Sequence, residues 1–334
     1  GKQGAAKAFL AGGNLHYSFK GFHVGATGIF YSYSLPLYPD KSQLYKRFAP
    51  EGKSFWNMSV DYGYVSHRLT MQGETAMGDC GVVATVNSMS YLFSEKWSLL
   101  ALYRFYPYRY YAMYSNSFKA GSDVQDESGG YVGMRWTPSA KWMVEAYGDV
   151  AYFAWPKYHT TGSTYAMDYL VSAVCQLSSF ISMGARYQYK WKNEATTQRA
   201  RLYLRMNRSA WSSKTQVDAT WLSSSRGYMA SEAFAYRYRW LRLQASMGYF
   251  HTSDYDSRVY ALEPGMLYTM SFGSYFGEGI RCALLAKVDV GSHWLLACKW
   301  AMTQYFDRNH ISSGLQQING SCQSDLELQL KWKW

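Results

Sequence analysis

Apolar and polar side chains alternate without interruption along the last ten residues of the chain, 325–334, which read DLELQLKWKW. Successive side chains on a β-strand point to opposite faces, so this pattern predicts a strand with two different faces. A strand of about ten residues is also long enough to cross a bilayer at a tilt. The apolar face would carry Leu326, Leu328, Leu330, Trp332 and Trp334, and the polar face Asp325, Glu327, Gln329, Lys331 and Lys333.

Two tryptophans, Trp332 and Trp334, close this strand on its apolar face. Aromatic rings at strand ends are typical of the girdle where a membrane meets water. A C-terminal aromatic residue also resembles the signal by which bacterial outer-membrane barrels are recognised for insertion. We therefore interpret Trp332 and Trp334 as girdle residues and as an insertion signal.

The same two-residue period recurs far from the C-terminus, in residues 181–192, 215–221 and 241–249. No helical period competes over a comparable length. About nineteen such segments, within a range of 18 to 20, are separated by turn residues. The predicted fold is an all-β, antiparallel up-and-down transmembrane β-barrel of the outer-membrane type, with residues 1–334 as a single domain.

The connections between the predicted strands alternate between short and long. Two predicted strands, 258–262 and 266–272, are joined by a turn at 263–265 and are counted in the wall. Barrels of this kind keep short turns on the periplasmic side, so the last strand would end there and the first would also run inward. Single-chain bacterial barrels have an even number of strands. The odd count therefore predicts at least one strand upstream of Gly1, with this chain as the C-terminal part of a larger barrel, and the alternative is that one hairpin is miscounted.

The composition favours a barrel over a soluble protein or a helical membrane protein. Aromatic residues make up 18% of the 334 residues, with 32 Tyr and 13 Trp, an excess that suits two interfacial belts. No window reaches the roughly 18 uncharged apolar residues that a membrane helix needs. The mean hydropathy of −0.32 is what alternating apolar and polar positions produce.

Charge and cysteine content restrict the function less. The net charge is +11, which would suggest nucleic acid or anionic membrane on a soluble protein but can lie in the lumen or at the rims of a barrel. The five cysteines have no CxxC spacing and their number is odd, so we expect neither a metal site nor a disulfide framework. The start of the chain contains no signal-peptide core, although an outer-membrane protein requires one.

Several longer motifs resemble a known family. They are LYRFYPYRYYAMYSNSF (102–118), DESGGYVGMRWTP (126–138), YGDVAYFAWPKY (147–158), SRVYALEPG (257–265), YFGEGIR (275–281) and YFDRNHISSGLQQI (305–318). The family comprises long proteins of the Bacteroidetes in which a helix-hairpin-helix region, similar to competence DNA-binding proteins, precedes a large outer-membrane β-barrel. The resemblance covers nearly all of this chain but only the C-terminal portion of the barrel. It implies upstream strands. The helix-hairpin-helix segment has no match in this chain, so DNA binding through that segment cannot be carried over.

The predicted strands direct a set of basic side chains away from the lipid, and a few acidic ones face the same way. One interpretation is a basic pore that favours anions, or a lumen that holds an acidic plug. The other is an interior whose charges only pair with one another, as any polar interior requires. The basic set is Arg186, Lys190, Lys192, Arg199, Arg201, Arg205, Lys214, Arg242, Lys331 and Lys333, and the acidic set is Asp218, Asp325 and Glu327.

A dense tyrosine cluster, with Arg104 and Arg109 interleaved, occupies one predicted loop. Its tyrosines are Tyr106, Tyr108, Tyr110, Tyr111 and Tyr114. Aromatic rings beside arginines can form a stacking platform for sugars or nucleic-acid bases. The alternative is an extracellular girdle extended into a loop, or a surface that binds a partner.

Catalytic and metal-binding patterns are weak. None of the seven histidines lies in a local triad or beside paired carboxylates, so we expect no enzyme and no cofactor. A calcium loop at Asp123, Asp126 and Glu127 would look like any acidic loop. The segment YFGEG has neither the lysine nor the following helix of a phosphate-binding loop.

The sequence thus predicts a protein of the bacterial outer membrane, porin-like, that acts as a pore or as a component of a transport or secretion assembly. The alternative is a scaffold barrel whose loops, or whose missing N-terminal region, bind a partner such as DNA or another envelope protein. Its expected surroundings are outer-membrane lipid and lipopolysaccharide, and its insertion would need the barrel assembly machinery. DNA would bind only through a region that this chain lacks.

Overall fold

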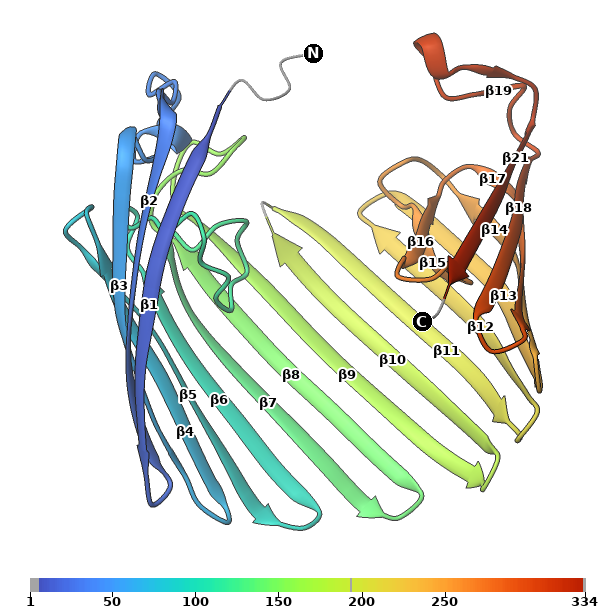
Figure 1. Ribbon diagram of the computed structural model, residues 1–334, viewed down its shortest axis with the longest axis horizontal. Coiled ribbons are helices and arrows are strands. Elements are labelled where there is room, and N and C mark those ends of the chain that lie inside the picture. The colour runs from blue at the N-terminus through green and yellow to red at the C-terminus, as the bar shows by residue number, and fades with distance from the viewer. Residues whose placement is uncertain (1–5, 193, 333–334) are drawn as a thin grey trace. The chain divides into compact units, whose positions relative to one another are not determined.

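The computed structural model describes residues 6–192 and 194–332, and the regular secondary structure within them is almost entirely β-strand (Figure 1). Seventeen strands of the described residues are long, between 10 and 16 residues. No helix in this part of the chain has the length and apolar character to span a membrane. The long strands are β1 (Ala8–Phe19), β2 (Phe22–Leu37), β3 (Gly52–Val65), β4 (Leu69–Gly78), β5 (Val83–Ser94), β6 (Trp97–Tyr106), β7 (Glu127–Ser139), β8 (Trp142–Phe153), β9 (Thr164–Ser178), β10 (Ile181–Lys192), β11 (Ala195–Asn207), β12 (Trp211–Leu222), β13 (Ser225–Tyr238), β14 (Leu241–Thr252), β17 (Glu278–Val290), β18 (Trp294–Tyr305) and β21 (Cys322–Trp332).

The strands form two compact units with the same up-and-down pattern. The N-terminal unit contains the chain up to Pro138 together with Glu145–Leu170 and Lys190–Glu194, and the C-terminal unit contains the rest. In the N-terminal unit, each strand from β1 to β7 pairs antiparallel with the next. In the C-terminal unit the same holds from β11 to β14, followed by the pairs β14–β17, β17–β18 and β18–β21.

Long connections collect at one end of the strands within each unit. The N-terminal unit has short turns after β1, β3 and β5, and its longer loops, 38–51 and 107–126, follow β2 and β6. The C-terminal unit has short turns after β11, β13 and β17, and its long connections, 253–277 and 306–321, follow β14 and β18. Successive turns of an antiparallel array alternate between its two ends. Within each unit, the long segments therefore lie at one end and the short turns named above lie at the other.

One of the long connections corrects the predicted strand count. Residues 258–262 and 266–272 were expected as wall strands, but β15 (Val259–Glu263) and β16 (Ser271–Tyr275) pair only with each other in the described structure. A strand of five residues is about half as long as a membrane-spanning strand must be. We call residues Val259–Tyr275 the inner hairpin. A second small pair, β19 (His310–Ile311) and β20 (Ile318–Asn319), lies within the last long loop.

The first hairpin illustrates how local sequence fixes a turn. Lys20 and Gly21 both have positive φ, 45° and 84°, as a two-residue turn between twisted strands requires. A Cβ at Gly21 would lie 2.4 Å from the carbonyl oxygen of Val65 on β3. Glycine is therefore needed here both for its conformation and for the close approach of the neighbouring strand.

Each unit has an apolar face and a polar face, because the register keeps the alternation in step from strand to strand. On the apolar face of the C-terminal unit, Leu326, Leu328 and Leu330 are 65%, 74% and 59% exposed. Burying apolar area from water is worth about 25 cal/mol per Å². An exposed face composed mainly of apolar side chains is therefore stable only against an apolar medium or partner.

The polar faces carry most of the buried side chains. In the N-terminal unit the loop 107–126 packs on this face, where Tyr106, Tyr110, Ala84 and Val124 form a buried cluster. In the C-terminal unit the inner hairpin takes the same role. Each polar face thus has a loop or hairpin packed on it, and charged side chains lie beside these segments.

Candidate functional site

The N-terminal unit holds its inward loop with one fully buried arginine. Arg104 on β6 has no exposed surface, and its guanidinium donates to Glu127 and to Asp149, with Nη1 and Nη2 at 2.7 and 3.1 Å from the two carboxylate oxygens of Asp149. The backbone N–H groups of Ala120 and Gly121 donate to Glu127 at 2.8 Å each. Glu127 therefore connects the buried arginine of the wall to the loop.

Glycine provides the room for this arginine. Gly129 lies opposite Arg104 in the β6–β7 register, and a Cβ there would lie 2.7 Å from Arg104 Cζ. Cβ atoms do not approach other atoms so closely, so any larger residue at 129 would displace the guanidinium.

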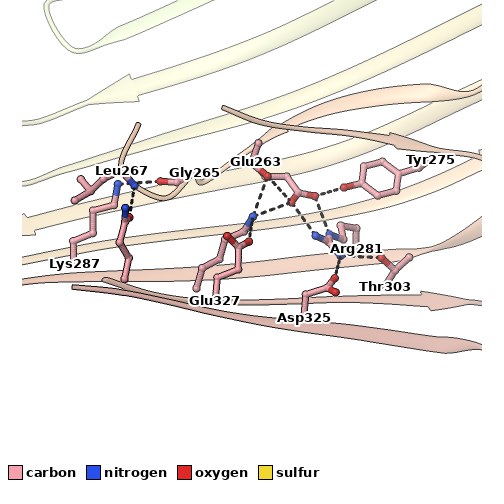
Figure 2. Close-up of polar contacts among 12 residues, drawn as sticks. Glu263, Gly265, Leu267, Tyr275, Arg281, Lys287, Thr303, Asp325 and Glu327 are labelled. Carbon is pink, nitrogen blue, oxygen red and sulfur yellow. Dashed lines mark hydrogen bonds and ion pairs between the residues drawn. The ribbon is translucent and has the colours of Figure 1, made fainter. Parts of the chain in front are cut away.

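The inner hairpin of the C-terminal unit is held by a second network, centred on Glu263 (Figure 2). Glu263 is 3% exposed at its side chain and accepts two bonds from Arg281, at 2.8 and 3.0 Å, as well as one from the Tyr275 hydroxyl. Figure 2 shows the Tyr275 hydroxyl and the Arg281 guanidinium both directed at this carboxylate. Lys299 donates to Ser271 at 3.0 Å and lies 3.3 Å from Glu327.

Electrostatics keeps this carboxyl ionised. Burial alone would raise the pKa of Glu263, but hydrogen bonds from Arg281 and Tyr275 outweigh it, so the pKa lies below the ordinary value for a glutamic acid. Burial and the bond to Glu263 raise the pKa of Tyr275. The tyrosine therefore stays a neutral donor and Glu263 a charged acceptor, which is the arrangement that makes short, strong bonds.

Further contacts attach the turn of the inner hairpin to three wall strands. Lys287 on β17 donates to the carbonyl of Gly265 at 2.9 Å, and the N–H of Leu267 donates to Gln329 on β21 at 2.9 Å. Lys331 donates to the Tyr268 hydroxyl. Met266 is buried against Leu285 and Leu295 on the wall.

Cations gather on the remaining polar face of the C-terminal unit, on β10 to β14 and β17. Arg205 lies opposite Lys214, and Arg242 lies opposite both Arg237 and Lys287. Like charges directly opposite each other destabilise a sheet, so this arrangement is not explained by strand pairing. We call this set the basic track: Arg186, Arg199, Arg201, Arg205, Lys214, Arg237, Arg242 and Lys287.

Among the described residues, two carboxylates contact the basic track. Asp218 accepts from Arg201 at 2.6 Å, and Asp289 accepts from Arg242 at 2.7 Å. A cavity of about 150 Å³ is lined by Arg186, Arg199 and Arg201 and by Tyr260 and Phe272 of the inner hairpin.

A second cavity, of about 330 Å³, lies at the short-turn end of the basic track. Its basic lining residues are Arg208, Arg237, Arg242 and Lys287. The track thus has one cavity along its length and another at its end.

The other residues predicted from the sequence to face the lumen or the membrane interface lie at separate places and have different partners. Lys190 lies 3.5 Å from Asp168, and Lys192 donates to the carbonyl of Ala120 at 3.0 Å. Asp325 lies 3.9 Å from Arg281. Trp332 is on the apolar face, with its ring 6.1 Å from that of Trp294. Lys333 and Trp334 lie outside the described residues.

The tyrosine cluster divides between wall and loop. Tyr106 is the last residue of β6 rather than a loop residue, and Tyr106 and Tyr110 are buried. Tyr108 stacks on Trp155, the Tyr111 and Phe55 rings are nearly perpendicular with centroids 6.0 Å apart, and the Tyr114 hydroxyl is 3.2 Å from that of Tyr33. The two buried rings, Tyr106 and Tyr110, line a cavity of about 310 Å³.

Sequence reasoning missed Arg208, Arg237 and Lys287. Arg237 has the parity of Ser231 on β13, and Lys287 has the parity of Arg281 on β17, so alternation would have placed both on the polar face. Arg208 lies in a turn, where alternation gives no direction. In the described part of the chain, His, Cys, Asp and Glu form no group of three or more that could hold a metal ion.

Comparison with known proteins identifies the fold class. No protein-family model and no curated protein matches the chain. Among solved structures, it is similar to the FrpB iron transporter from Neisseria meningitidis. The F3-3 variant has a TM-score of 0.53 at 8% identity, over 98% of this chain and 65% of that chain. The apoprotein form of the F5-1 variant gives 0.53 at 8% identity, over 98% and 64%.

These similarities establish the fold, which is that of the outer-membrane β-barrels, as the alternating strands predict. The chain spans slightly less than two thirds of the length of these two structures. At 8% identity, a solved structure gives the arrangement of strands and not the substrate.

Proposed function

We propose that this chain forms the wall of an outer-membrane transport barrel and that the basic track lines a path for anionic solutes. The observation that carries the proposal is the excess of cations on one face. Eight arginine and lysine side chains lie on the polar face of β10 to β14 and β17, against Asp218 and Asp289. A barrel interior whose charges only pair would need about one carboxylate for each cation.

The track is suited to binding anions weakly and repeatedly. Arginine offers a planar set of donors that matches carboxylate and phosphate groups. Conduction requires sites that an ion enters readily and also leaves, and a series of similar sites meets both conditions. The cavities at Arg199 and at Arg242 are two such sites along the same polar face.

The inner hairpin is placed to control this path. Tyr260 and Phe272 stack at 5.5 Å and line the same cavity as Arg186 and Arg199. The Arg199 guanidinium lies 5.9 Å from the Tyr260 ring. Movement of the hairpin would therefore change both the width of the path and the surroundings of its arginines.

Planar-bilayer recordings in a KCl gradient test the proposal. The protein should conduct ions, and its reversal potential should be displaced toward the equilibrium potential of chloride. The double variant Arg186→Gln, Arg199→Gln should lower the chloride-to-potassium permeability ratio by about twofold or more, because a fixed positive potential raises the local anion concentration. Neither arginine has a carboxylate partner among the described residues, so neither substitution leaves a buried charge behind.

Arg226→Gln is the matched control. Arg226 is exposed near the loop end of β13, on the apolar side of the register opposite Trp221, so its removal should leave selectivity unchanged. A folded protein that passes no ions would overturn the proposal in favour of a scaffold barrel that binds DNA or an envelope protein. Cation selectivity of the unaltered protein would overturn the anion path.

The sequence resemblance to Bacteroidetes barrels with a helix-hairpin-helix region supports an envelope setting for this function. We therefore also propose that the chain belongs to that family, that it lies in the outer membrane and that the barrel assembly machinery inserts it. Fractionation of the envelope from cells that make the full-length protein would test the location directly.

A further inference from the structure

One carboxylate of the C-terminal unit, Glu232, lies on the apolar face. Glu232 on β13 is exposed and lies opposite Thr215 on β12 and Met247 on β14. The same cross-strand row continues through Leu204 on one side and Cys282 on the other. Glu232 therefore interrupts the apolar face rather than joining the polar one.

The position of Glu232 along β13 puts it near the middle of that face. On the same face of β13, Tyr228 and Tyr236 lie four residues before and after it, at the places expected for two aromatic belts. Four residues of strand cover about 13 Å. In a membrane, Glu232 would therefore lie far from both interfaces, where a charged side chain is costly and marks a functional site by default.

The described chain offers this carboxylate little compensation. The Thr215 hydroxyl donates to it, and no Lys, Arg or His of the described residues lies within ion-pair distance. A carboxylate in an apolar medium needs a proton or a cation beside it. Within residues 6–192 and 194–332, the chain supplies Glu232 with one hydroxyl donor but with no cation.

An apolar groove lies directly beside Glu232. Its volume is about 490 Å³, and its lining is almost entirely apolar. Thr215, which donates to Glu232, lines the groove, so the polar group lies at its edge. Other lining residues on the apolar face are Trp142, Cys175, Met183, Leu202, Leu204 and Val217.

We propose that the groove and Glu232 together form a docking surface for a membrane-embedded segment of another protein that carries a lysine, arginine or histidine at mid-membrane depth. An apolar side chain of that segment fills the groove while its basic side chain pairs with Glu232. Such a pair satisfies both charges in a medium where neither is stable alone. This partner surface goes beyond transport and rests on the proposed membrane placement alone.

Charge complementarity selects this partner over a second copy and over lipid. A two-fold contact between copies would bring Glu232 against itself, because a two-fold interface presents the same patch from both sides. The described cross-strand row from Leu204 to Met302 supplies no Lys or Arg at this depth. The headgroups of lipids stay at the interfaces and do not reach the middle of the face.

Model peptides in lipid vesicles test the proposal. The probes are two transmembrane helices of about 20 leucines that carry an acceptor dye, one with a single central lysine and one without. Energy transfer from the tryptophans of the inserted protein measures association. We expect the lysine peptide to associate at least about tenfold more tightly than the all-leucine peptide, and Glu232→Gln to abolish this preference.

Two variants complete the experiment. Glu278→Gln removes the carboxylate that Tyr249 contacts at the loop end of the same face and should keep the preference. Ala185→Trp, which fills the groove, should weaken both peptides. Glu232→Gln removes an uncompensated charge and is expected to fold.

Equal association of the two peptides with the unaltered protein would overturn the proposal, as would a preference that survives in Glu232→Gln. Insertion is verified first, by protection of the strands from added protease. A failure of membrane placement is therefore seen separately from a failure of docking.

Discussion

At the scale of single residues, the faces of the strands are determined by alternation, but the pairing of charges is not. Arg104 shows the difference. Alternation puts it on the polar face of β6, yet its full burial depends on Glu127, Asp149 and the loop that covers them. These partners come from β7, β8 and residues 120–121, and nothing local in the sequence connects them.

Replacing this arginine should be severely destabilising. Arg104→Met would leave Glu127 and Asp149 buried without a cation, and breaking a buried ion pair on one side costs about 3–5 kcal/mol. Urea unfolding of the protein in vesicles, followed by tryptophan fluorescence, measures the change in the free energy of unfolding.

Arg135→Met serves as the control for that experiment. Arg135 also pairs with a carboxylate, at 2.7 Å from Glu145, but both side chains are exposed, so the loss should be about 0–1 kcal/mol. Equal effects of the two substitutions would mean that Arg104 is not buried in the folded protein.

Glu232 shows that a residue can break a pattern visibly in the sequence. In residues 228–236 the positions with its parity are Tyr228, Ala230, Phe234 and Tyr236, so the carboxylate stands out by alternation alone. Its depth between two aromatic belts, and the groove beside it, come from cross-strand register and could not be predicted.

At the scale of elements, strand length separates wall strands from inserted ones. The inner hairpin was expected in the wall because its residues have strand-like composition, but its five-residue strands cannot span a bilayer. Its place is decided by Glu263, Met266 and Tyr275, which find partners on the polar face of β17 and β18. Such contacts join residues far apart in sequence, so local patterns do not report them.

Weakening this attachment should loosen the inner hairpin without unfolding the wall. In Glu263→Gln, the charge-assisted bonds from Arg281 become ordinary ones, and the hairpin should lose about 2 kcal/mol of attachment. Limited trypsin cleavage at Arg258 should then be at least about tenfold faster. Glu327→Gln, which changes an exposed partner of Lys299, should leave the cleavage rate nearly unchanged.

The same attachment sets a pH dependence with a defined sign. The pKa of Glu263 is lower in the folded protein than in the unfolded chain, where it is about 4.3. Its contribution to stability is therefore present above about pH 4.3 and is lost as the pH falls through the folded pKa. Channel current noise should be constant from about pH 8 to 5 and rise only below about pH 4. Loosening between pH 5 and 7 would contradict this, and Glu263→Gln should lack the acid step.

At the scale of the whole molecule, the two faces determine where the protein is stable. The apolar faces of both units are exposed and unbroken apart from a few positions, and the polar faces hold the charges and the inserted segments. A protein of this kind gains its stability from lipid on one side and from water and polar contacts on the other.

A charge placed at the middle of the apolar face tests this arrangement. Leu328→Arg, on β21 and 74% exposed, should destabilise the protein in vesicles by about 2–4 kcal/mol. Gln323→Arg, on the opposite face of the same strand, should cost little. Equal costs at the two positions in urea unfolding would mean that the two faces do not meet different media.

The sequence by itself determined the fold class, because a period of two with aromatic strand ends satisfies the bilayer strand by strand and needs no distant partner. Residues 325–332 already separate Leu326, Leu328 and Leu330 from Asp325 and Glu327. Only the tertiary structure decided which loops fold inward, that Tyr106 and Tyr110 are buried, and that the basic track runs across β10 to β14 and β17. These three features depend on the register between strands and on contacts between residues that are far apart in the sequence. Local sequence patterns report neither.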